Sequence, residues 1–340
     1  MPVTSHAWHL VRRPHGEPVA EDFELVEHEL PAPGSGEILV NNTWLSVDPY
    51  MRGRMNDAKS YVAPFALGEP MDGGAVGVVE QVGPDVEGLA VGDTVLHGLG
   101  WRERAVLPPD RTQRVDVDLA APQAYLGVLG MPGLTAYAGL LDVAQLHEGD
   151  VVFVSAAAGA VGSLVGQFAR LKGASAVVGS AGGPAKTQWL LDELGFTHAL
   201  DYKARPIREQ LREAAPDGID VYFDNVGGDH LEAAIGALRL HGRAALCGAI
   251  SAYNATEPPP GPRNLARLVQ NRLTLRGFLV RDHADARPRF LQDVASWLRE
   301  GRITRRETVS EGIESAPDAF RSLLSGGNTG KMLVRLDPDR

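Results

Sequence analysis

The stretch VVFVSAAAGAVGSLVGQFARLKG (151–173) decides the fold. An apolar run (151–156) leads directly into a turn of alanines and glycines, and a segment of helical period follows, which predicts a buried strand, a tight turn and a helix. The turn has the form A-x-G-x-x-G (157–162), a variant of the glycine-rich fingerprint of dinucleotide-binding folds. Small residues are needed there because the main chain must approach a pyrophosphate closely, while the amino end of the helix attracts the anion.

The same alternation of apolar runs and helical segments continues to about residue 300. The further runs are SAVVGSA (175–181), HALDY (198–202), DVYFDNV (220–226), RAALCGAI (243–250) and LTLRGFLV (273–280). The helical segments between and after them include AKTQWLLDELG (185–195), PIREQLREAAP (206–216), DHLEAAIGALRLHG (229–242) and RPRFLQDVASWLREG (287–301). Strands without polar alternation, each followed by a helix, indicate a parallel sheet covered on both faces. We therefore predict an α/β domain over 129–300 with a Rossmann-type, doubly wound parallel sheet.

Residues 1–128 have a different pattern, in which short segments rich in β-forming residues alternate with turn residues. Examples are EILVNNTWLSV (37–47), GAVGVVEQVG (74–83) and DTVLHGL (93–99). This pattern predicts a partly closed antiparallel β domain. The segment 301–340 ends in the strand-like KMLVRL (331–336), and we expect it to pair back and complete that first domain.

The amino-acid composition and charge of the chain exclude several classes of binding partner. The chain of 340 residues has 33 Lys and Arg against 43 Asp and Glu, a net charge of −10, which disfavours nucleic acid. It has no signal-peptide core, and no apolar run reaches the roughly 18 residues of a membrane helix. Its one cysteine, Cys247, excludes an intramolecular disulfide. We expect a cytoplasmic protein with no membrane partner.

The residues after the second strand predict the cofactor. An NAD site usually carries an acid about 20 residues beyond the glycine turn. Counting from Gly159, that place holds Gly179, Ser180 and Ala181, and Lys186 follows at the start of the next helix. A cation without a competing acid favours a 2′-phosphate and hence NADP(H). The alternative is that Lys186 is an ordinary exposed helical lysine.

The order of the two domains resembles the medium-chain dehydrogenase/reductase superfamily. Its zinc-dependent members need spaced Cys and His ligands. Here the corresponding stretch, LGEPMDGGAVGVVEQVG (67–83), has no G-H-E triplet, Cys247 lies on a predicted core strand, and His6 and His9 read as surface residues. We therefore expect no metal site.

Motifs along nearly the whole chain are similar to the zinc-free alkenal and enone reductases, which include the leukotriene B4 12-hydroxydehydrogenase, prostaglandin reductase and plant double-bond reductase types. The motifs are LSVDPYMRGRM (45–55), GLTAY (133–137), SAAAGAVGS (155–163), ELGF (193–196), YFDNVGG (222–228), ALCGAISAYN (245–254) and GNTGK (327–331). The match is looser at 56–72. The resemblance implies that the first domain is GroES-like, and that the chain forms a homodimer through an edge strand such as 273–280.

The resemblance also implies a cofactor site. Its residues would be Ala158, Gly159, Ala160, Val161, Gly162, Ser163, Lys186, Tyr202, Asn225, Cys247, Gly248, Ala249, Ile250, Ser251, Tyr253, Phe278, Leu279, Val280 and Asn328. Three of these have structural alternatives. Tyr202 could be a strand-end aromatic, Phe278 a core residue, and Cys247 a small core hydrophobe that contributes only its main chain.

The implied reaction is NADPH-dependent reduction of the carbon–carbon double bond of an α,β-unsaturated ketone or aldehyde. Charge would build on the carbonyl oxygen, so a hydrogen-bond donor must stabilise it. Tyr253 is our candidate, beside the ribose 2′-hydroxyl of the cofactor, and either Tyr253 or water would supply the proton. Tyr50 and Arg52 would border the substrate, against the alternatives of packing for Tyr50 and an internal ion pair for Arg52.

Three other functions stay open at this point. A quinone reductase of the same superfamily would share the cofactor site. An alcohol dehydrogenase is disfavoured because the zinc ligands are missing. A non-catalytic NADPH-binding protein would need a partner-binding element, and the sequence offers none.

Overall fold

The computed structural model describes residues 2–337 and contains two compact units. Unit 1 holds the chain up to Gly127, the segment Glu307–Asn328, and the chain from Met332 onward. Unit 2 holds Val128–Arg306 and the short segment Thr329–Lys331.

Unit 2 is built on a six-stranded parallel sheet in the order β10-β9-β8-β11-β12-β13. The strands are β8 (Val151–Val154), β9 (Ala176–Ala181), β10 (His198–Asp201), β11 (Ile219–Asp224), β12 (Leu238–Leu246) and β13 (Thr274–Gly277). The order reverses between β8 and β11, as in doubly wound dinucleotide-binding sheets, so the predicted Rossmann-type fold is confirmed. In such sheets ligands bind beyond the carboxyl ends of the strands, at the point of reversal.

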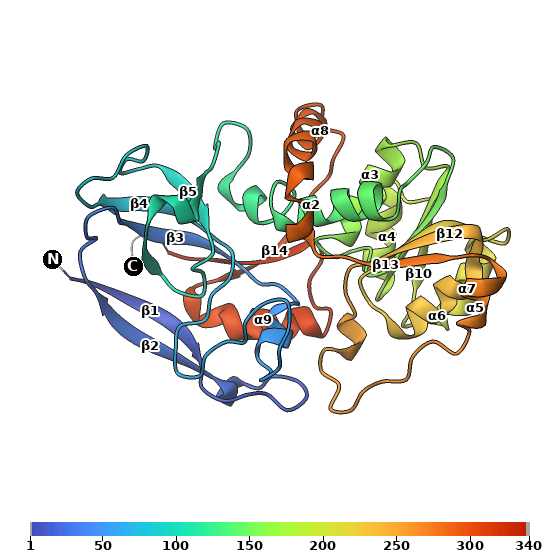
Figure 1. The fold of residues 1–340 in the computed structure, drawn as a ribbon, viewed down its shortest axis with the longest axis horizontal. Helices are drawn as coiled ribbons and strands as arrows, with labels where there is room; N and C mark the ends of the chain where they lie inside the picture. Colours follow the sequence, from blue (N-terminus) through green and yellow to red (C-terminus); the bar gives the residue numbers. More distant parts are fainter. Residues whose placement is uncertain (1, 338–340) are drawn as a thin grey trace. The chain divides into compact units, whose positions relative to one another are not determined.

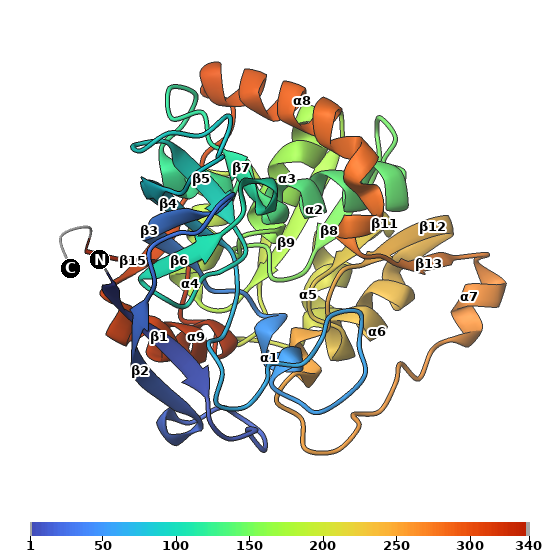
Figure 2. The same ribbon diagram turned by 60° about the vertical axis from the view of Figure 1, so that its left-hand side comes forward.

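Helices cover both faces of this sheet. They are α2 (Met131–Ala138), α3 (Gly162–Leu171), α4 (Pro184–Asp192), α5 (Ile207–Ala214), α6 (Gly228–Ala237), α7 (Ala266–Gln270) and α8 (Arg287–Arg299). α2, α3 and α8 lie on one face, and α5 and α6 lie on the other (Figures 1 and 2). Burial on both sides explains the continuous apolar runs, since Phe153, Tyr222 and Phe223 of the central strands are fully buried.

One predicted boundary in unit 2 is wrong. The segment 229–242 reads as a helix, but α6 ends at Ala237 and β12 begins at Leu238. The pairing of β11 with β12 jumps from Ile219–Leu238 to Val221–Arg243, so β12 carries a wide irregularity in which His241 has a φ of 62°. Sheet pairing therefore overrides the helical spacing of the apolar residues.

Unit 1 is antiparallel. A two-stranded hairpin, β1 (Val3–Leu10) with β2 (Phe23–Leu30), accompanies a larger sheet in the order β14-β15-β3-β4-β5-β7, with β6 also paired to β3. The strands of the larger sheet are β3 (Ile38–Ser46), β4 (Ala75–Val82), β5 (Thr94–His97), β6 (Arg104–Leu107), β7 (Thr112–Arg114), β14 (Glu307–Glu311) and β15 (Lys331–Arg335). β15 pairs antiparallel with β3, which confirms that the C-terminal strand returns to the first sheet.

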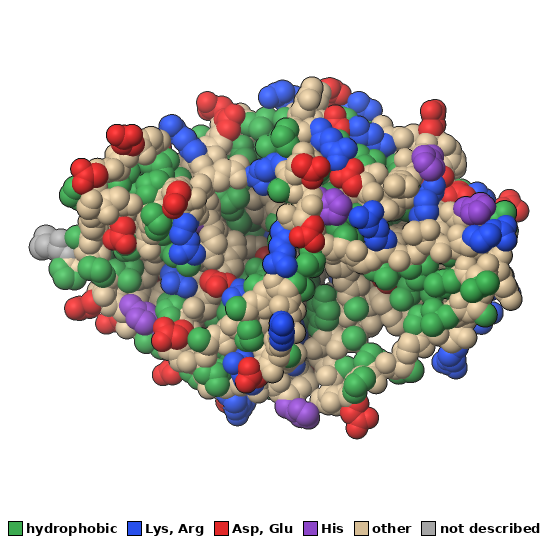
Figure 3. Space-filling view, in the orientation of Figure 1, with side chains coloured by type: hydrophobic (Ala, Val, Ile, Leu, Met, Phe, Trp, Pro, Cys, Tyr) green, Lys and Arg blue, Asp and Glu red, His purple; other side chains and the backbone are tan. Residues whose placement is uncertain are grey.

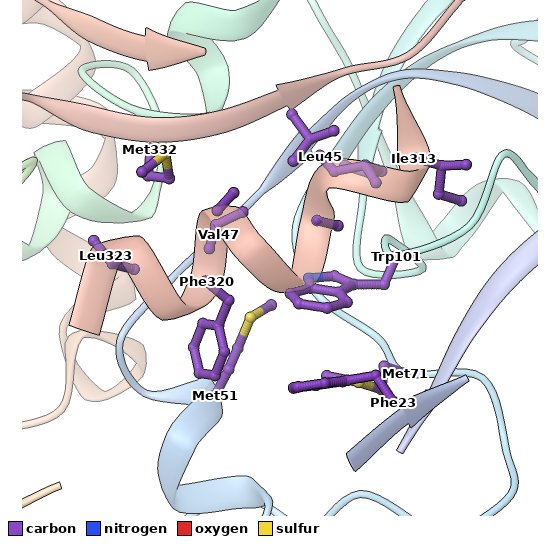
Figure 4. Packing of buried hydrophobic residues seen from close by; sticks show 14 of the residues in the cluster. Phe23, Leu45, Val47, Met51, Met71, Trp101, Ile313, Phe320, Leu323 and Met332 are labelled. Carbon is purple, nitrogen blue, oxygen red and sulfur yellow. The ribbon is translucent and has the colours of Figure 1, made fainter. Parts of the chain in front are cut away.

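Two helices, α1 (Met51–Arg54) and α9 (Ala316–Leu324), complete unit 1. A cluster of buried residues packs beneath α9 around Trp101, which is fully buried (Figure 4). The Trp101 ring stacks on Phe23 at 6.3 Å between centroids and meets Phe320 of α9 edge-on at 6.0 Å. α9 was not predicted, because the sequence of the tail is mixed in character.

The surface shows no dominant sign of charge on the face drawn in Figure 3, where acidic and basic side chains are interspersed. Among residues 2–337, no helix is long and apolar enough to cross a membrane.

Candidate functional site

The turn between β8 and α3 has a conformation that demands small residues. Ala156 adopts a left-handed φ of 47°, and the Gly159 amide donates to the Ala156 carbonyl over 2.9 Å. A Cβ on Gly162 would lie 2.4 Å from that same carbonyl oxygen, so only glycine fits at the first residue of α3. Gly162 therefore leaves the backbone open at the amino end of α3, which suits the close approach of a pyrophosphate.

A distant segment of the chain pairs with this turn. The Gly330 amide donates to the Ala158 carbonyl over 2.7 Å, and Gly330 forms a bridge with Gly159. A Cβ on Gly330 would lie 1.8 Å from the Arg306 carbonyl, so this position also requires glycine. The GNTGK motif thus supports the turn through Gly330, whereas the predicted Asn328 lies two residues earlier and is itself buried.

The end of β9 brings cations together. Lys186 lies on α4, and a Cβ on Gly182 would lie 2.9 Å from both the Tyr202 hydroxyl and Cε of Lys203. Burial lowers the pKa of Lys186, and the positive charge of Lys203 lowers it further. Two neighbouring ammonium groups and an exposed tyrosine hydroxyl form a setting for a phosphate group.

The nearest acid to these cations is already occupied. Asp201 accepts hydrogen bonds from the Gly183 amide (2.9 Å) and the Lys203 amide (3.0 Å), so it fixes the turn. This agrees with the absence of an acid at the position where an NAD site would use one. The sequence analysis named Lys186 and Tyr202 as candidates but not Lys203. The only feature of the sequence that could have pointed to Lys203 is its position next to Tyr202 in DYK.

The carboxyl ends of β8 and β11 are joined where the strand order reverses. The Asn225 amide donates to Ser155 Oγ over 2.9 Å, and Asn225 Nδ2 donates to the Ser155 carbonyl over 2.8 Å. Asn225, predicted from its place at the end of a strand, therefore lies at the switch point of the sheet.

Asp224 connects several segments at this edge of the sheet, and the sequence analysis did not identify it. Its carboxylate is 2% exposed and accepts from Tyr222 (2.7 Å), Ser155 Oγ (3.2 Å) and the amides of Val226 (2.9 Å) and Gly227 (2.8 Å). Its carbonyl accepts from the amides of Cys247 (2.8 Å) and Gly248 (3.0 Å). One buried residue thus ties together the ends of β8, β11 and β12.

The chain after β12 passes over this edge, and it contains the predicted catalytic tyrosine. Tyr253 ends a short 3-10 turn, Ile250–Ala252, and its hydroxyl lies 3.2 Å from where a Cβ of Gly248 would be. The Asn225 carbonyl lies 3.5 Å from the same point. The missing side chain of Gly248 therefore makes room for the Tyr253 hydroxyl beside the carboxyl ends of β11 and β12. Ser251 fixes the segment by donating to the Val226 carbonyl over 2.6 Å.

Two predicted residues of this region carry structural side chains. Loss of hydration, and then the charge of Asp224, raise the pKa of the Cys247 thiol to about 12, so the sulfur is no nucleophile at neutral pH. The Phe278 ring meets Phe223 edge-on at 6.2 Å and would lie 2.5 Å from a Cβ on Gly139, so one side of it packs against the core while the residue stays partly exposed.

In unit 1, the predicted residues Tyr50 and Arg52 have different surroundings. The Arg52 guanidinium is buried and donates to the Gly16 carbonyl (2.8 Å) and to Asn56 Oδ1 (2.7 Å). Tyr50 packs against the hydrophobic cluster, and burial, with Asp48 second, raises its pKa well above the ordinary value. Its hydroxyl therefore stays protonated.

No group of three or more His, Cys, Asp or Glu side chains with the geometry to hold a metal ion occurs within residues 2–337. The prediction that His6 and His9 lie at the surface is wrong for His9, which is buried, and both histidines have partners. His9 Nε2 lies 2.9 Å from His28 Nε2, and His6 pairs with the buried Glu103 at 2.9 Å.

Comparisons with known proteins match both units. Residues 6–115 match the family model described as the N-terminal domain of oxidoreductase, and residues 160–296 match the one described as zinc-binding dehydrogenase. The chain is 43% identical to the NADPH-dependent curcumin reductase of Escherichia coli, over 98% of this chain and 97% of that protein. It is 43% identical to the NADP-dependent 2-alkenal reductase of Nicotiana tabacum, over 94% of each chain.

A solved structure has the same fold throughout. The crystal structure of CurA from Vibrio vulnificus in complex with NADPH superimposes with a TM-score of 0.93 at 43% identity, covering 98% of this chain and 99% of that chain.

Proposed function

Because the chain belongs to the medium-chain dehydrogenase/reductase superfamily, in the group that includes the alkenal, curcumin and prostaglandin reductases, we propose that it reduces the carbon–carbon double bond of α,β-unsaturated ketones and aldehydes. The protein is an NADP-dependent oxidoreductase. When bound, NADPH supplies the hydride, which would be delivered to the β-carbon of the substrate.

The position of the Tyr253 hydroxyl carries this proposal. It lies over Gly248, at the edge of the sheet where dinucleotides bind. As the β-carbon is reduced, negative charge develops on the carbonyl oxygen, and a phenol that keeps its proton can donate a hydrogen bond to it. We assign this role to Tyr253. Asp224 positions the hydroxyl indirectly, because it holds the ends of β11 and β12 in register.

The remaining residues would bind the cofactor. The turn at 158–163, supported by Gly330, would hold the pyrophosphate at the amino end of α3. Lys186, Lys203 and the Tyr202 hydroxyl would contact the 2′-phosphate, whose charge offsets the repulsion between the two ammonium groups. Asn225, Ser251, the main chain of 247–250 and 278–280, and Asn328 would face the nicotinamide half.

In unit 1 we assign Tyr50 to the substrate pocket, since its protonated hydroxyl can donate to a polar group of the substrate. Arg52 we assign instead to positioning the loop at 14–16, because its guanidinium donates to that loop. We propose that the reaction is independent of zinc, which the lack of a ligand cluster in residues 2–337 supports.

The family relationship further supports a homodimer formed through β13, the edge strand of the parallel sheet, in the cytoplasm. Light scattering of the purified protein measures the dimer directly.

A quinone reductase is the second candidate, since it would use the same cofactor site. Turnover of 2-nonenal, a cyclic enone and a 1,2-quinone, followed by the loss of NADPH absorbance, separates the two functions. The proposal predicts that both enones are reduced faster than the quinone. Failure on both enones, with turnover of the quinone, would overturn it.

A further inference from the structure

A second pocket lies in unit 2, away from the cofactor edge. It has a volume of about 490 Å³ and lies between α5, α6 and the segment that enters α7. Its floor is the chain at 215–218, just before β11, and at 236–238, where β12 begins. Figures 1 and 2 show α5 and α6 side by side there. Because all strands of the sheet are parallel, this is the amino edge, opposite the edge that carries Asn225 and Tyr253.

Three arginines around the pocket have no partner. Arg208 and Arg212 lie four residues apart on α5, and hence on one face of it, and Arg267 lies on α7. All three side chains are exposed, and none makes a hydrogen bond or ion pair within residues 2–337. By contrast Arg239, which also lines the pocket, is bound to Asp220 (2.8 Å) and to the Asp217 carbonyl (2.8 Å). The lining also contains the carboxylates of Asp217 and Glu232, so four arginines stand against two acids, and this local excess of positive charge favours an anion.

Asn264 lies in the wall of the pocket. It donates from Nδ2 to the Glu232 carbonyl over 2.8 Å, and its Oδ1 is buried without a hydrogen-bond partner in the described part of the chain. Because this oxygen has essentially no exposed surface, a ligand in the pocket contacts other atoms of the wall.

A glycine in α6 keeps the pocket open. Gly236 lies near the end of the helix, where alanine would favour the helix more than glycine does. Packing does not require it, since a Cβ there would meet only Asn264 Nδ2, at an ordinary 3.6 Å. A larger side chain at this position would extend into the pocket.

We propose that this pocket binds a small phosphate ester. The planar guanidinium groups of Arg208, Arg212 and Arg267 suit the oxygens of a phosphate ester, which they can contact in pairs. The organic part of the ester would fill the cavity beside Gly236. The site is separate from the cofactor site, so it can be occupied while NADPH is bound.

Calorimetric titration of ribose 5-phosphate into protein saturated with NADPH tests this, because the bound cofactor blocks the other phosphate sites. We expect binding of one molecule per chain, and weaker binding of ribose and of inorganic phosphate. The double variant Arg212→Gln/Arg267→Gln should bind at least about tenfold more weakly, since charge-assisted hydrogen bonds are lost. Gly236→Leu should block binding without a change of charge.

Arg299→Gln is the matched control, because Arg299 is an exposed arginine of α8 outside the pocket, and this variant should bind as the wild type does. Equal affinity of the double variant and the wild type would overturn the proposal. So would binding that disappears when NADPH is added, or equal binding of inorganic phosphate and the ester. The readout is binding heat, so it is independent of which substrate the enzyme reduces.

Discussion

At the residue scale, the reaction that we propose depends on the phenol group of Tyr253. Tyr253→Phe removes only the hydroxyl oxygen that lies beside Gly248. We expect enone turnover to fall about a hundredfold, the usual cost of one oxyanion donor, while NADPH affinity changes by less than about twofold. Steady-state kinetics and fluorescence titration of NADPH measure the two quantities. A turnover within twofold of wild type would remove Tyr253 from the mechanism.

We propose that the cofactor preference depends on two lysines, Lys186 of α4 and Lys203 just after β10. Lys186→Ala and Lys203→Ala should each weaken NADPH binding by about tenfold or more, because each removes a charge-assisted contact to the 2′-phosphate. Binding of NADH, which lacks that phosphate, should change little. Equal losses for the two cofactors would show that the lysines act only on the fold.

The candidate site residues that the sequence analysis named can be located by their spacing in the sequence, whereas those it did not name are defined by long-range contacts. Lys186 and Asn225 stand at fixed places relative to a glycine turn or a strand end, so spacing finds them. Asp224 acts through contacts with residues 155 and 247–248, which are distant in sequence. Its role depends on which strands are neighbours, and the strand order cannot be read from the periodicity of one strand.

At the element scale, the turn between β8 and α3 leaves no room for a side chain at Gly162. Gly162→Ala would place a Cβ 2.4 Å from the Ala156 carbonyl, so the turn must open. We expect NADPH affinity to fall by at least about tenfold, because the amides at the start of α3 move away from the pyrophosphate. Isothermal titration calorimetry with NADPH measures this.

Gly236→Ala is the matched control for that helix glycine. It has room for a Cβ, so NADPH affinity should stay unchanged and the free energy of unfolding should rise by about 1 kcal/mol. If both variants bound NADPH equally well, the close approach at Gly162 would not matter for the cofactor.

The elements of unit 2 follow from the sequence because buried parallel strands are continuous apolar runs. The exceptions have local causes. The end of α6 is misplaced because L-R-L after Ala237 fits a helix as well as a strand, and only the pairing with β11 decides. The pairing of Gly330 with Ala158 joins residues far apart in sequence, which no periodicity reports.

At the scale of the whole molecule, stability should depend on pH through a buried histidine of unit 1. His97 lies between Asn42 Oδ1 (2.8 Å) and the Leu99 amide (3.1 Å), which requires the neutral ring. Burial, with Arg102 second, lowers its pKa to about 4. Because this lies below the unfolded value of 6.5, its contribution is complete above pH 6.5 and is lost as the pH falls towards 4, by about 3 kcal/mol in all.

Urea unfolding at pH 7.5 and pH 5 measures this dependence. His97→Gln should be less stable at pH 7.5 but should lose less stability on going to pH 5 than the wild type does. The exposed His198 offers the control, since His198→Gln should keep the dependence of the wild type. If the stability of His97→Gln changed between pH 7.5 and pH 5 as much as that of the wild type, groups other than His97 would cause the pH dependence.

The proposed function requires that the enzyme delivers hydride to a carbon–carbon double bond. The direct measurement is the position of the label after 2-nonenal is reduced with NADPH that carries deuterium at the transferable position. The account predicts nonanal with deuterium on the β-carbon. An unsaturated alcohol with deuterium on the carbonyl carbon would contradict it.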